Sequence, residues 1–247
     1  MDNLYRGTEH PLSIIKNEAY NVFSELGFEV ATGPELETEW YCFDALNMPK
    51  DHPSRDMQDT FWIKMTEEEI EKSRSGNRSE RPVMRTQATA STIRALEKAQ
   101  KDNRYPAAFI TIGKVFRNEA TDATHEAQFF QIDGSMIGEG VTLSNLKGVL
   151  LHFYKKVLGE DAEVEFRPSF FPFVEPGLEV HAKFKGKWLE MGGAGMIHAN
   201  VLRNAGFDPE KVQGFAFGLG LERIPMVRFG VSDIRYFHQG DLRLNQF

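Results

Sequence analysis

The stretch AFGLGLERIPM, from Ala216 to Met226, holds two closely spaced glycines, Gly218 and Gly220, and passes at once into a glutamate and an arginine. Its glycine spacing is that of a dinucleotide-binding loop, which joins a strand to a helix and needs a third glycine where the helix packs. No third glycine stands in register here. The stretch therefore does not predict a dinucleotide site, and its glycines need another explanation.

If the stretch is a strand, its residues alternate between two faces. Phe217, Leu219 and Leu221 point one way, whereas the two glycines and Glu222 point the other. A face of bare glycines lets a flat ligand lie against the backbone. Arg223, at the start of a helix predicted in LERIPMVRFG, would then reach a phosphate. The alternative is a glycine bend before a helix whose glutamate and arginine form surface pairs, and this stretch alone leaves both open.

A second stretch, VFRNEATDATHEAQFFQIDG, favours the nucleotide interpretation. It places Arg117 and Glu119 on one face of a strand, followed by a polar loop and an aromatic strand. A guanidinium offers forked donors and stays charged, which suits an α-phosphate. Glu119 can accept a hydrogen bond from an exocyclic amine, and Phe129 or Phe130 can stack on a base. The alternative is an ordinary hairpin with a cross-strand ion pair.

Composition limits the class of protein. The 247 residues are 41% apolar and 26% charged, which is typical of a soluble globular chain. No apolar run reaches membrane-spanning length, no signal pattern is found, and the single cysteine, Cys42, rules out an internal disulfide or a Cys-rich zinc site. We therefore expect a cytoplasmic protein. The net charge of −7 indicates that a tight grip on nucleic acid would need another chain or domain.

Periodicity predicts one α+β domain over residues 1–247. A helix is expected in HPLSIIKNEAYNVFSELGF, then a strand in FEVATGPELE that closes at Gly33-Pro34. Residues 64–82 are very polar and read as an insertion, in which Thr66 and Glu69 form a capping-box pattern for a short helix. Further helices are expected at 90–100 and 143–159. Strands are expected at 107–119, 127–138, 163–170, 178–193 and 214–220, and because several follow one another directly, the central sheet should be mainly antiparallel.

Together these stretches resemble the class II aminoacyl-tRNA synthetases. Motif 2 of that family corresponds to Phe116–Glu119, motif 3 to Gly218–Arg223, and motif 1, a helix and a strand ending in proline, to His10–Pro34. Within the family, FDALNMPKDHPSRDMQDTFW, FRPSFFPFVEP and WLEMGGAGMI are similar to the catalytic core of phenylalanyl-tRNA synthetase α subunits, from about His10 to the C-terminus. VFRNEATDATH and EMGGAGMI lean toward the archaeal and eukaryotic form, and DLRLNQF toward the bacterial one.

The resemblance implies an ATP site with assigned roles. The motif 2 arginine, Arg117, binds the α-phosphate and the amino-acid carboxylate, and the motif 3 arginine, Arg223, binds the γ-phosphate. These two arginines are the predicted catalytic residues, because the reaction needs positioning and charge neutralisation rather than a protein nucleophile. Glu190 is the candidate ligand of Mg²⁺. The other expected ATP contacts are Glu119, His125, Phe129, Gly218 and Gly220.

For the amino acid, the resemblance implies that Phe171 and Phe173 bracket the ring of phenylalanine edge-to-face. The glycine-rich GGAG, with Gly193, and Ala216 form a small floor beneath the ring. The remaining expected contacts, which include the partners of the α-amino group, are Gln87, Thr89, Thr92, Gln131 and Asp133. Without the other motifs, a phenylalanine pair packed in the core would be the better interpretation of Phe171 and Phe173.

This sequence departs from the family pattern at several of these positions. Gln87 and Phe130 stand where the family has histidines, Asp133 where it has glutamate, and Val174 and Gly177 where it has threonine and serine. These changes leave the reaction type intact but bear on which amino acid is activated. They therefore keep alternatives to phenylalanine open.

The expected function is ATP-dependent activation of phenylalanine and its transfer to tRNA(Phe). A homodimer formed through motif 1, a β subunit in an α2β2 assembly, or both are the expected partners, and no membrane is involved. One rival hypothesis is a stand-alone paralogue that activates another amino acid or modifies an acceptor other than tRNA. Another is a regulatory or assembly protein with a degenerate site, against which the retained pairs Arg117–Glu119 and Glu222–Arg223 argue.

Overall fold

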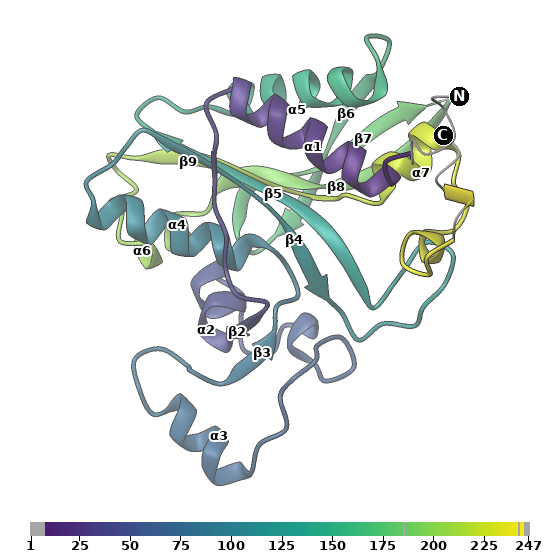
Figure 1. Ribbon diagram of the computed structural model, residues 1–247. Coiled ribbons are helices and arrows are strands. Elements are labelled where there is room, and N and C mark those ends of the chain that lie inside the picture. Colours follow the sequence, from purple (N-terminus) through teal and green to yellow (C-terminus); the bar gives the residue numbers. More distant parts are fainter. Residues whose placement is uncertain (1–7, 185, 242, 245–247) are drawn as a thin grey trace.

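The computed structural model describes residues 8–184, 186–241, 243 and 244. Its centre is a seven-stranded sheet in the order β1-β4-β5-β9-β8-β7-β6 (Figure 1). The strands are β1 (Glu29–Val30), β4 (Ala107–Phe116), β5 (Gln128–Gly138), β6 (Glu163–Phe171), β7 (Val174–Phe184), β8 (Lys187–Ile197) and β9 (Gln213–Gly220). All neighbours are antiparallel except β1 and β4, so the predicted α+β class and mainly antiparallel sheet are confirmed.

Three strand predictions were wrong. The strand predicted at 107–119 ends at Phe116, and the strand predicted from residue 28 to Gly33-Pro34 is reduced to Glu29–Val30. Residues 178–193 form no single strand: they belong to β7 and β8, which pair as a hairpin. The chain reverses at Gly186, whose φ of +78° is a conformation that residues with a side chain rarely adopt. The alternating pattern continues on both sides of this glycine, which is why the sequence reads as one strand.

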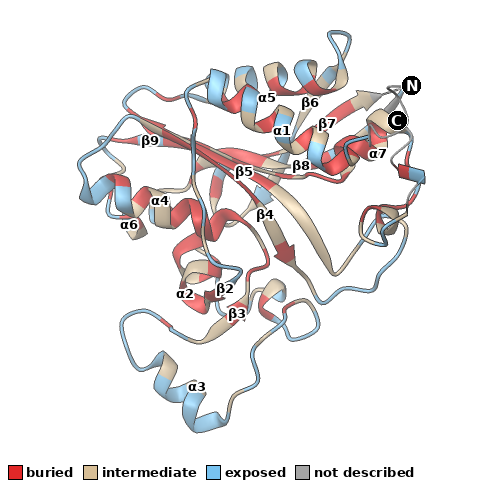
Figure 2. Ribbon diagram, in the orientation of Figure 1, coloured by how far each residue is buried: buried red, intermediate tan, exposed pale blue. Residues whose placement is uncertain are grey.

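Two long helices cover one face of the sheet. α1 (Pro11–Glu25) and α5 (Leu143–Leu158) lie side by side over it, with α7 (Arg223–Phe229) at the end of α1 (Figure 1). Their apolar sides pack on inward residues of the strands in the larger core cluster, and this layer is red in Figure 2. α4 (Thr89–Lys101) and α6 (Ala199–Asn204) belong to the second cluster, which covers part of the other face and leaves the rest open.

A smaller lobe lies beside this open part (Figure 1). It contains the two-stranded sheet of β2 (Leu36–Thr38) and β3 (Pro82–Met84), the helices α2 (Glu39–Cys42) and α3 (Glu67–Arg74), and two short 3-10 turns, Asp44–Leu46 and Pro53–Arg55. A third such turn, Ile234–Phe237, follows α7. The predicted capping box is confirmed: Thr66 and Glu69 bond reciprocally at the start of α3. In the described part of the chain, no helix is both long and apolar enough to cross a bilayer.

Candidate active site

The glycine face of β9 opens into a cavity of about 660 Å³. Phe217, Leu219 and Leu221 are at most 2% exposed and belong to the core on the far side of the sheet. Gly218 and Gly220 line the cavity, as the alternation predicted, although Phe217 also borders it. Both glycines lie opposite β5 residues, so their missing side chains leave room above the centre of the sheet.

Motif 2 forms one wall of this cavity. Arg117 directly follows β4, so Arg117 and Glu119 do not lie on a strand as predicted, and the side chain of Arg117 is 40% exposed toward the cavity. Its Nη1 lies 4.0 Å from Glu119 Oε1, and its guanidinium carbon lies 5.1 Å from the centre of the Phe129 ring. Arg117 Nε donates to the carbonyl of Thr86 at 3.3 Å, which leaves the outer nitrogens free to face a ligand. The arrangement presents a forked cation beside an aromatic plate.

The loop that closes motif 2 carries His125. Its Nδ1 lies 3.0 Å from a carboxylate oxygen of Asp122, and its side chain is 51% exposed. The backbone N–H of Thr124 and the ring of His125 hold the pKa of Asp122 below its usual range. The ring is therefore oriented by a carboxylate and lines the cavity.

The opposite end of the cavity holds a buried carboxylate, Asp133. Thr89 Oγ1 and Thr92 Oγ1 each donate to one of its oxygens at 2.5 Å. Asp133 is 2% exposed, and burial raises its pKa to about 6, although the two hydroxyls act to lower it. Asp133 and Thr89 line the cavity, whereas Thr92 lies behind Asp133 and reaches the cavity only through it.

Two glutamines flank Asp133 with defined orientations. Gln131 Oε1 accepts from the backbone N–H of Ala88 at 2.8 Å, which directs its NH₂ group toward Gly218. Gln87 Nε2 donates to the carbonyl of Cys42 at 3.2 Å, so its oxygen remains available as an acceptor. This end of the cavity therefore combines a carboxylate, an amide acceptor and an amide donor, which suits a zwitterionic α-amino acid.

Two phenylalanines cover the apolar part of the cavity. The rings of Phe171 and Phe173 lie 5.8 Å apart at an angle of 20°, with Phe171 at the end of β6 and Phe173 in the turn before β7. A Cβ built on Gly193 would lie 2.9 Å from the Phe171 ring, so the ring rests on bare backbone. Val174 is 4% exposed and fills the space that Gly195 leaves empty. Ala216 completes the floor.

Two departures from the family pattern have a structural explanation. Phe130 packs against the larger core cluster, on the face opposite Gln131, and is not among the cavity residues. It therefore cannot select the ligand by contact. A Cβ on Gly177 would lie 2.6 Å from the carbonyl oxygen of Ser169, so this strand pairing has no space for a side chain.

Glu222 is buried rather than paired with Arg223. It is 1% exposed, accepts from the backbone N–H of Phe130 at 2.7 Å, and lies 3.3 Å from His238 Nε2. Burial raises its pKa, although the contacts with His238 and Phe130 act to lower it. Glu222 thereby ties the start of α7 to β5 and sets Arg223, which lines the cavity, in place.

A metal site made by protein alone is absent from the residues that the structure describes: no three or more His, Cys, Asp or Glu side chains are grouped so that they could hold an ion. Glu190 is exposed and lines the cavity on β8. One carboxylate in an open cavity is a donor set that fits Mg²⁺ only when substrate phosphates and water supply the other ligands.

Comparisons with known proteins agree with this geometry. The model of the tRNA synthetases class II core domain (F) matches residues 1–247. The chain belongs to this family. It is 43% identical over 252 residues to the phenylalanine–tRNA ligase alpha subunit of Bacillus pumilus, with 97% of this chain and 68% of that protein covered. It is 45% identical over 255 residues to the subunit of the same name from Anoxybacillus flavithermus, covering 98% of this chain and 69% of that protein.

A solved structure shares the fold. The pyrrolysyl-tRNA synthetase from Desulfitobacterium hafniense superposes with a TM-score of 0.73, at 16% identity, over 94% of this chain and 74% of that one. The family model, the relatives and the solved structure all indicate the class II synthetase fold. The family resemblance found in the sequence is therefore confirmed.

Nearly all the site residues predicted from the sequence line one cavity. The exception is Thr92. Four lining residues were not predicted: Met48, His52, Ser54 and Asp59. They lie in the stretch from Phe43 to Trp62, which resembles the family but to whose residues no role was assigned. Part of the C-terminal stretch DLRLNQF, Leu242 and residues 245–247, lies outside the described residues.

Proposed function

We propose that the chain is the catalytic core of a phenylalanine–tRNA ligase α subunit, which activates phenylalanine with ATP and transfers it to tRNA(Phe). One observation carries the proposal: a single cavity joins phosphate-binding arginines, an aromatic plate, a zwitterion-binding end and an apolar aromatic slot. Identity of 43–45% to α subunits over nearly the whole chain favours phenylalanine over another amino acid and an active enzyme over a degenerate one.

In this proposal the protein positions two reactants. A carboxylate oxygen of phenylalanine attacks the α-phosphorus of ATP, a new P–O bond forms, the bond to the bridging oxygen breaks, and pyrophosphate leaves. Arg117 holds the α-phosphate and the attacking carboxylate together, and Arg223 holds the γ-phosphate that departs. A terminal ribose hydroxyl of tRNA then attacks the activated carbonyl, and AMP is released.

The nucleotide base is proposed to lie between the glycine face of β9 and the Phe129 ring. Glu119, near Arg117, accepts from the adenine amine, and His125 reaches the phosphate tail. Mg²⁺ would be held by Glu190 together with the phosphates, where it would neutralise charge on the polyphosphate. This arrangement is supported by the fact that all these residues line the same cavity.

Phenylalanine is proposed to occupy the other end. Its ammonium group would pair with Asp133, which Thr89 and Thr92 hold by hydrogen bonds, while its carboxylate would accept from the Gln131 amide. The ring would enter the slot of Phe171 and Phe173. Aromatic contacts of this kind add about 0.5–1.5 kcal/mol beyond burial.

The test is amino-acid-dependent exchange of labelled pyrophosphate into ATP, measured for each amino acid. We expect exchange with phenylalanine and none of comparable rate with the others. Arg223→Ala should lower that rate by about 10²-fold or more, since it removes a cation from the leaving group. Exchange with another amino acid only would favour the paralogue, no exchange would favour a non-catalytic protein, and full activity of Arg223→Ala would contradict its assignment.

Gly193→Ala should weaken phenylalanine binding selectively. The new Cβ would stand 2.9 Å from the Phe171 ring and force it into the slot that the substrate ring needs. Overpacking typically costs about 1–3 kcal/mol, which corresponds to a KM for phenylalanine raised about 5- to 150-fold. The KM for ATP should stay unchanged. Gly148→Ala in α5, where a Cβ meets no atom within 4 Å, is the control. Equal KM values in the two variants would show that Gly193 does not border the slot.

Partners follow from the same assignment. The relatives are named alpha subunits, so we propose that a β subunit assembles with this chain, and that motif 1, α1 with β1, contributes to a homodimeric contact within an α2β2 assembly. The net charge of −7 supports a partner that provides much of the tRNA-binding surface. We place the activity in the cytoplasm, because the relatives are named as tRNA ligases.

A further inference from the structure

The cavity wall that the motifs did not predict is a loop of residues 48–59, here called the cavity loop. Four of its residues, Met48, His52, Ser54 and Asp59, line the cavity. The loop also touches both sides of the amino-acid end. Met48 Sδ lies 3.7 Å from Gln87 Nε2, and the adjacent Asn47 donates from Nδ2 to the carbonyl of Pro172, between the two slot phenylalanines, at 2.7 Å.

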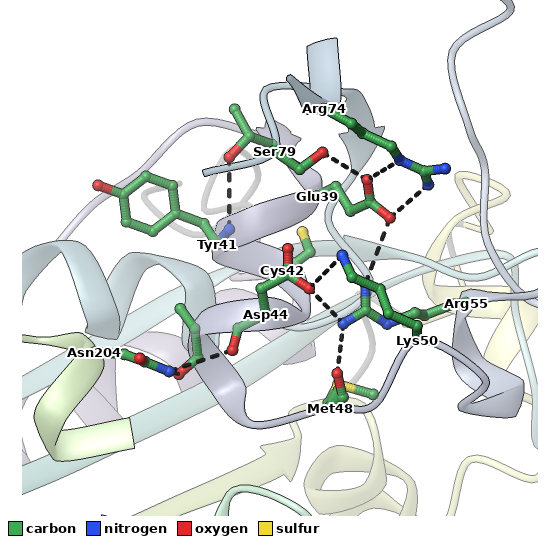
Figure 3. Close-up of polar contacts among 12 residues, drawn as sticks. Glu39, Tyr41, Cys42, Asp44, Met48, Lys50, Arg55, Arg74, Ser79 and Asn204 are labelled. Carbon is green, nitrogen blue, oxygen red and sulfur yellow. Dashed lines mark hydrogen bonds and ion pairs between the residues drawn. The ribbon is translucent and has the colours of Figure 1, made fainter. Parts of the chain in front are cut away.

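Arg55 fastens this loop from the inside. Its side chain is 6% exposed, and Nη2 donates to the carbonyl of Met48 at 2.5 Å and to Asp44 Oδ1 at 2.8 Å (Figure 3). The guanidinium carbon lies 4.9 Å from the Phe43 ring centre. Its own carbonyl accepts from Trp62 Nε1 at 3.1 Å. A buried arginine with this set of bonds ties the middle of the cavity loop to Met48 at its start and to Trp62 beyond its end.

Glu39 holds Arg55 and the polar insertion at once. Its side chain is 2% exposed, and Oε1 accepts from Arg55 Nη1 at 3.4 Å and from Arg74 Nη2 at 2.6 Å (Figure 3). Its Oε2 accepts from Arg74 Nε at 2.8 Å and from Ser79 Oγ at 2.6 Å. Burial alone would raise the pKa of Glu39, but the hydrogen bonds from Arg74 and Ser79 hold it below the usual range. Glu39 therefore stays ionised between two arginines.

Arg74 lies in α3, so the insertion supplies one of the two arginines that bond to Glu39. Two more arginines of the insertion stack on tryptophans outside it. The guanidinium carbon of Arg78 lies 3.7 Å from the centre of the Trp40 ring, and that of Arg81 lies 3.8 Å from the centre of the Trp62 ring. Because α3 itself buries no residue, these contacts and the backbone hydrogen bonds from Glu39 and Trp40 to the carbonyls of Arg81 and Ser79 attach the insertion, rather than a core. The insertion is thus fastened to the segment that carries the cavity loop.

The far end of the loop is tied to motif 2. Asn118, between Arg117 and Glu119, donates its backbone N–H to the carbonyl of Asp59 at 3.1 Å and its Nδ2 to the carbonyl of Met57 at 2.9 Å. A displacement of the loop would therefore be felt at the amino-acid end through Met48 and at the nucleotide end through Asn118.

We propose that Glu39, Arg55 and Arg74 form a clasp that positions the cavity loop, so that the polar insertion determines how tightly phenylalanine is bound. These three are positioning residues: none of them is a cavity residue, and each acts through the loop. The proposal rests on the proposed function for its substrate. Its structural part, the coupling of α3 to the loop, is independent of that function.

The chain offers a matched control. Glu37, with 1% of its side chain exposed, pairs with Arg94 in the same two-bond geometry, Nε to Oε1 at 2.6 Å and Nη2 to Oε2 at 2.7 Å. Arg94 is 36% exposed, close to the 42% of Arg74, and neither member lines the cavity. Arg74→Ala and Arg94→Ala therefore remove equivalent arginines, of which only one belongs to the clasp.

The experiment compares these variants and Arg74→Lys in two measurements. The first is hydrogen exchange of the ligand-free protein at the amides of Arg55, Thr60 and Asn118, which bond to carbonyls within the loop. The second is pyrophosphate exchange with phenylalanine. We expect Arg74→Ala to lose protection at these amides and to raise the KM for phenylalanine roughly tenfold with a smaller change in kcat, because slight misplacement of a binding wall is costly. Arg74→Lys should restore part of both, and Arg94→Ala should change neither.

Unchanged protection in Arg74→Ala would overturn the proposal. So would lost protection with an unchanged KM, since the clasp would then be structural only. A KM raised equally by Arg94→Ala would also overturn it, because the effect would be a general loss of stability. If the wild-type protein shows no exchange with phenylalanine, the proposed function has failed, and the comparison of hydrogen exchange between Arg74→Ala and Arg94→Ala still decides whether α3 holds the loop.

Discussion

Asp133→Asn is expected to raise the melting temperature of the ligand-free protein at pH 8 while nearly abolishing phenylalanine binding. The folded state holds the Asp133 proton up to a pKa of about 6, against an ordinary value of 3.8. The stability from this group is therefore fully present below pH 3.8 and is lost as pH rises through 6. Two pKa units correspond to about 3 kcal/mol of folding free energy. This is an upper bound for the stability that wild type loses above pH 7 when Asp133 ionises, and that the neutral amide keeps.

The same substitution removes the proposed partner of the substrate ammonium. Loss of one member of a buried ion pair costs about 3–5 kcal/mol, so the KM for phenylalanine should rise by roughly 10²-fold or more. Thermal unfolding from pH 4 to pH 8 and pyrophosphate exchange check both halves. The melting curves of variant and wild type should converge toward pH 4. A variant that is less stable than wild type at pH 8, or that binds phenylalanine normally, would contradict this role of Asp133.

The role of Asp133 could be predicted only in part from the sequence, because its environment depends on how α4 packs. The family resemblance named the residue, and in the structure β5 carries it into the cavity together with Gln131. Its state depends on Thr89 and Thr92, which approach from α4 across the sheet. Sequence spacing does not reveal that Thr92 stands behind the carboxylate rather than in the cavity, because that depends on how the helix packs.

The fold was predictable where local signals agree with tertiary packing. The apolar stripe of α1, the capping box of α3 and the alternation of β9 each follow from residues close together in the chain. The cavity loop is different. Bonds between distant residues hold it, such as Asn47 to Pro172 and Arg55 to Glu39, and no periodicity marks it as a wall. The turn at Gly186 was missed for the opposite reason, since alternation continues across it.

Arg117→Lys is expected to lower kcat for phenylalanine-dependent pyrophosphate exchange by about 10²-fold, even though the positive charge is kept. Lysine has no fork to hold the α-phosphate and the attacking carboxylate together, and it loses the planar contact with Phe129, now 5.1 Å from the guanidinium carbon. At pH 7 the defect should come from the lost fork rather than from lost charge, so pyrophosphate exchange is compared at that pH. Arg104→Lys, in an exposed pair with Glu29, is the control.

The split between kinetic constants identifies the role of Arg117. If it acts in the transition state, kcat and kcat/KM should fall together while the KM for ATP changes little. A variant in which only the KM for ATP rises would make Arg117 a ground-state binding residue, which is the role proposed for Glu119 beside it. A variant with wild-type kcat would remove Arg117 from the catalytic assignment altogether. The geometry favours the first result, because Thr86 fixes Nε and leaves the fork open toward the cavity, where the two substrates must meet.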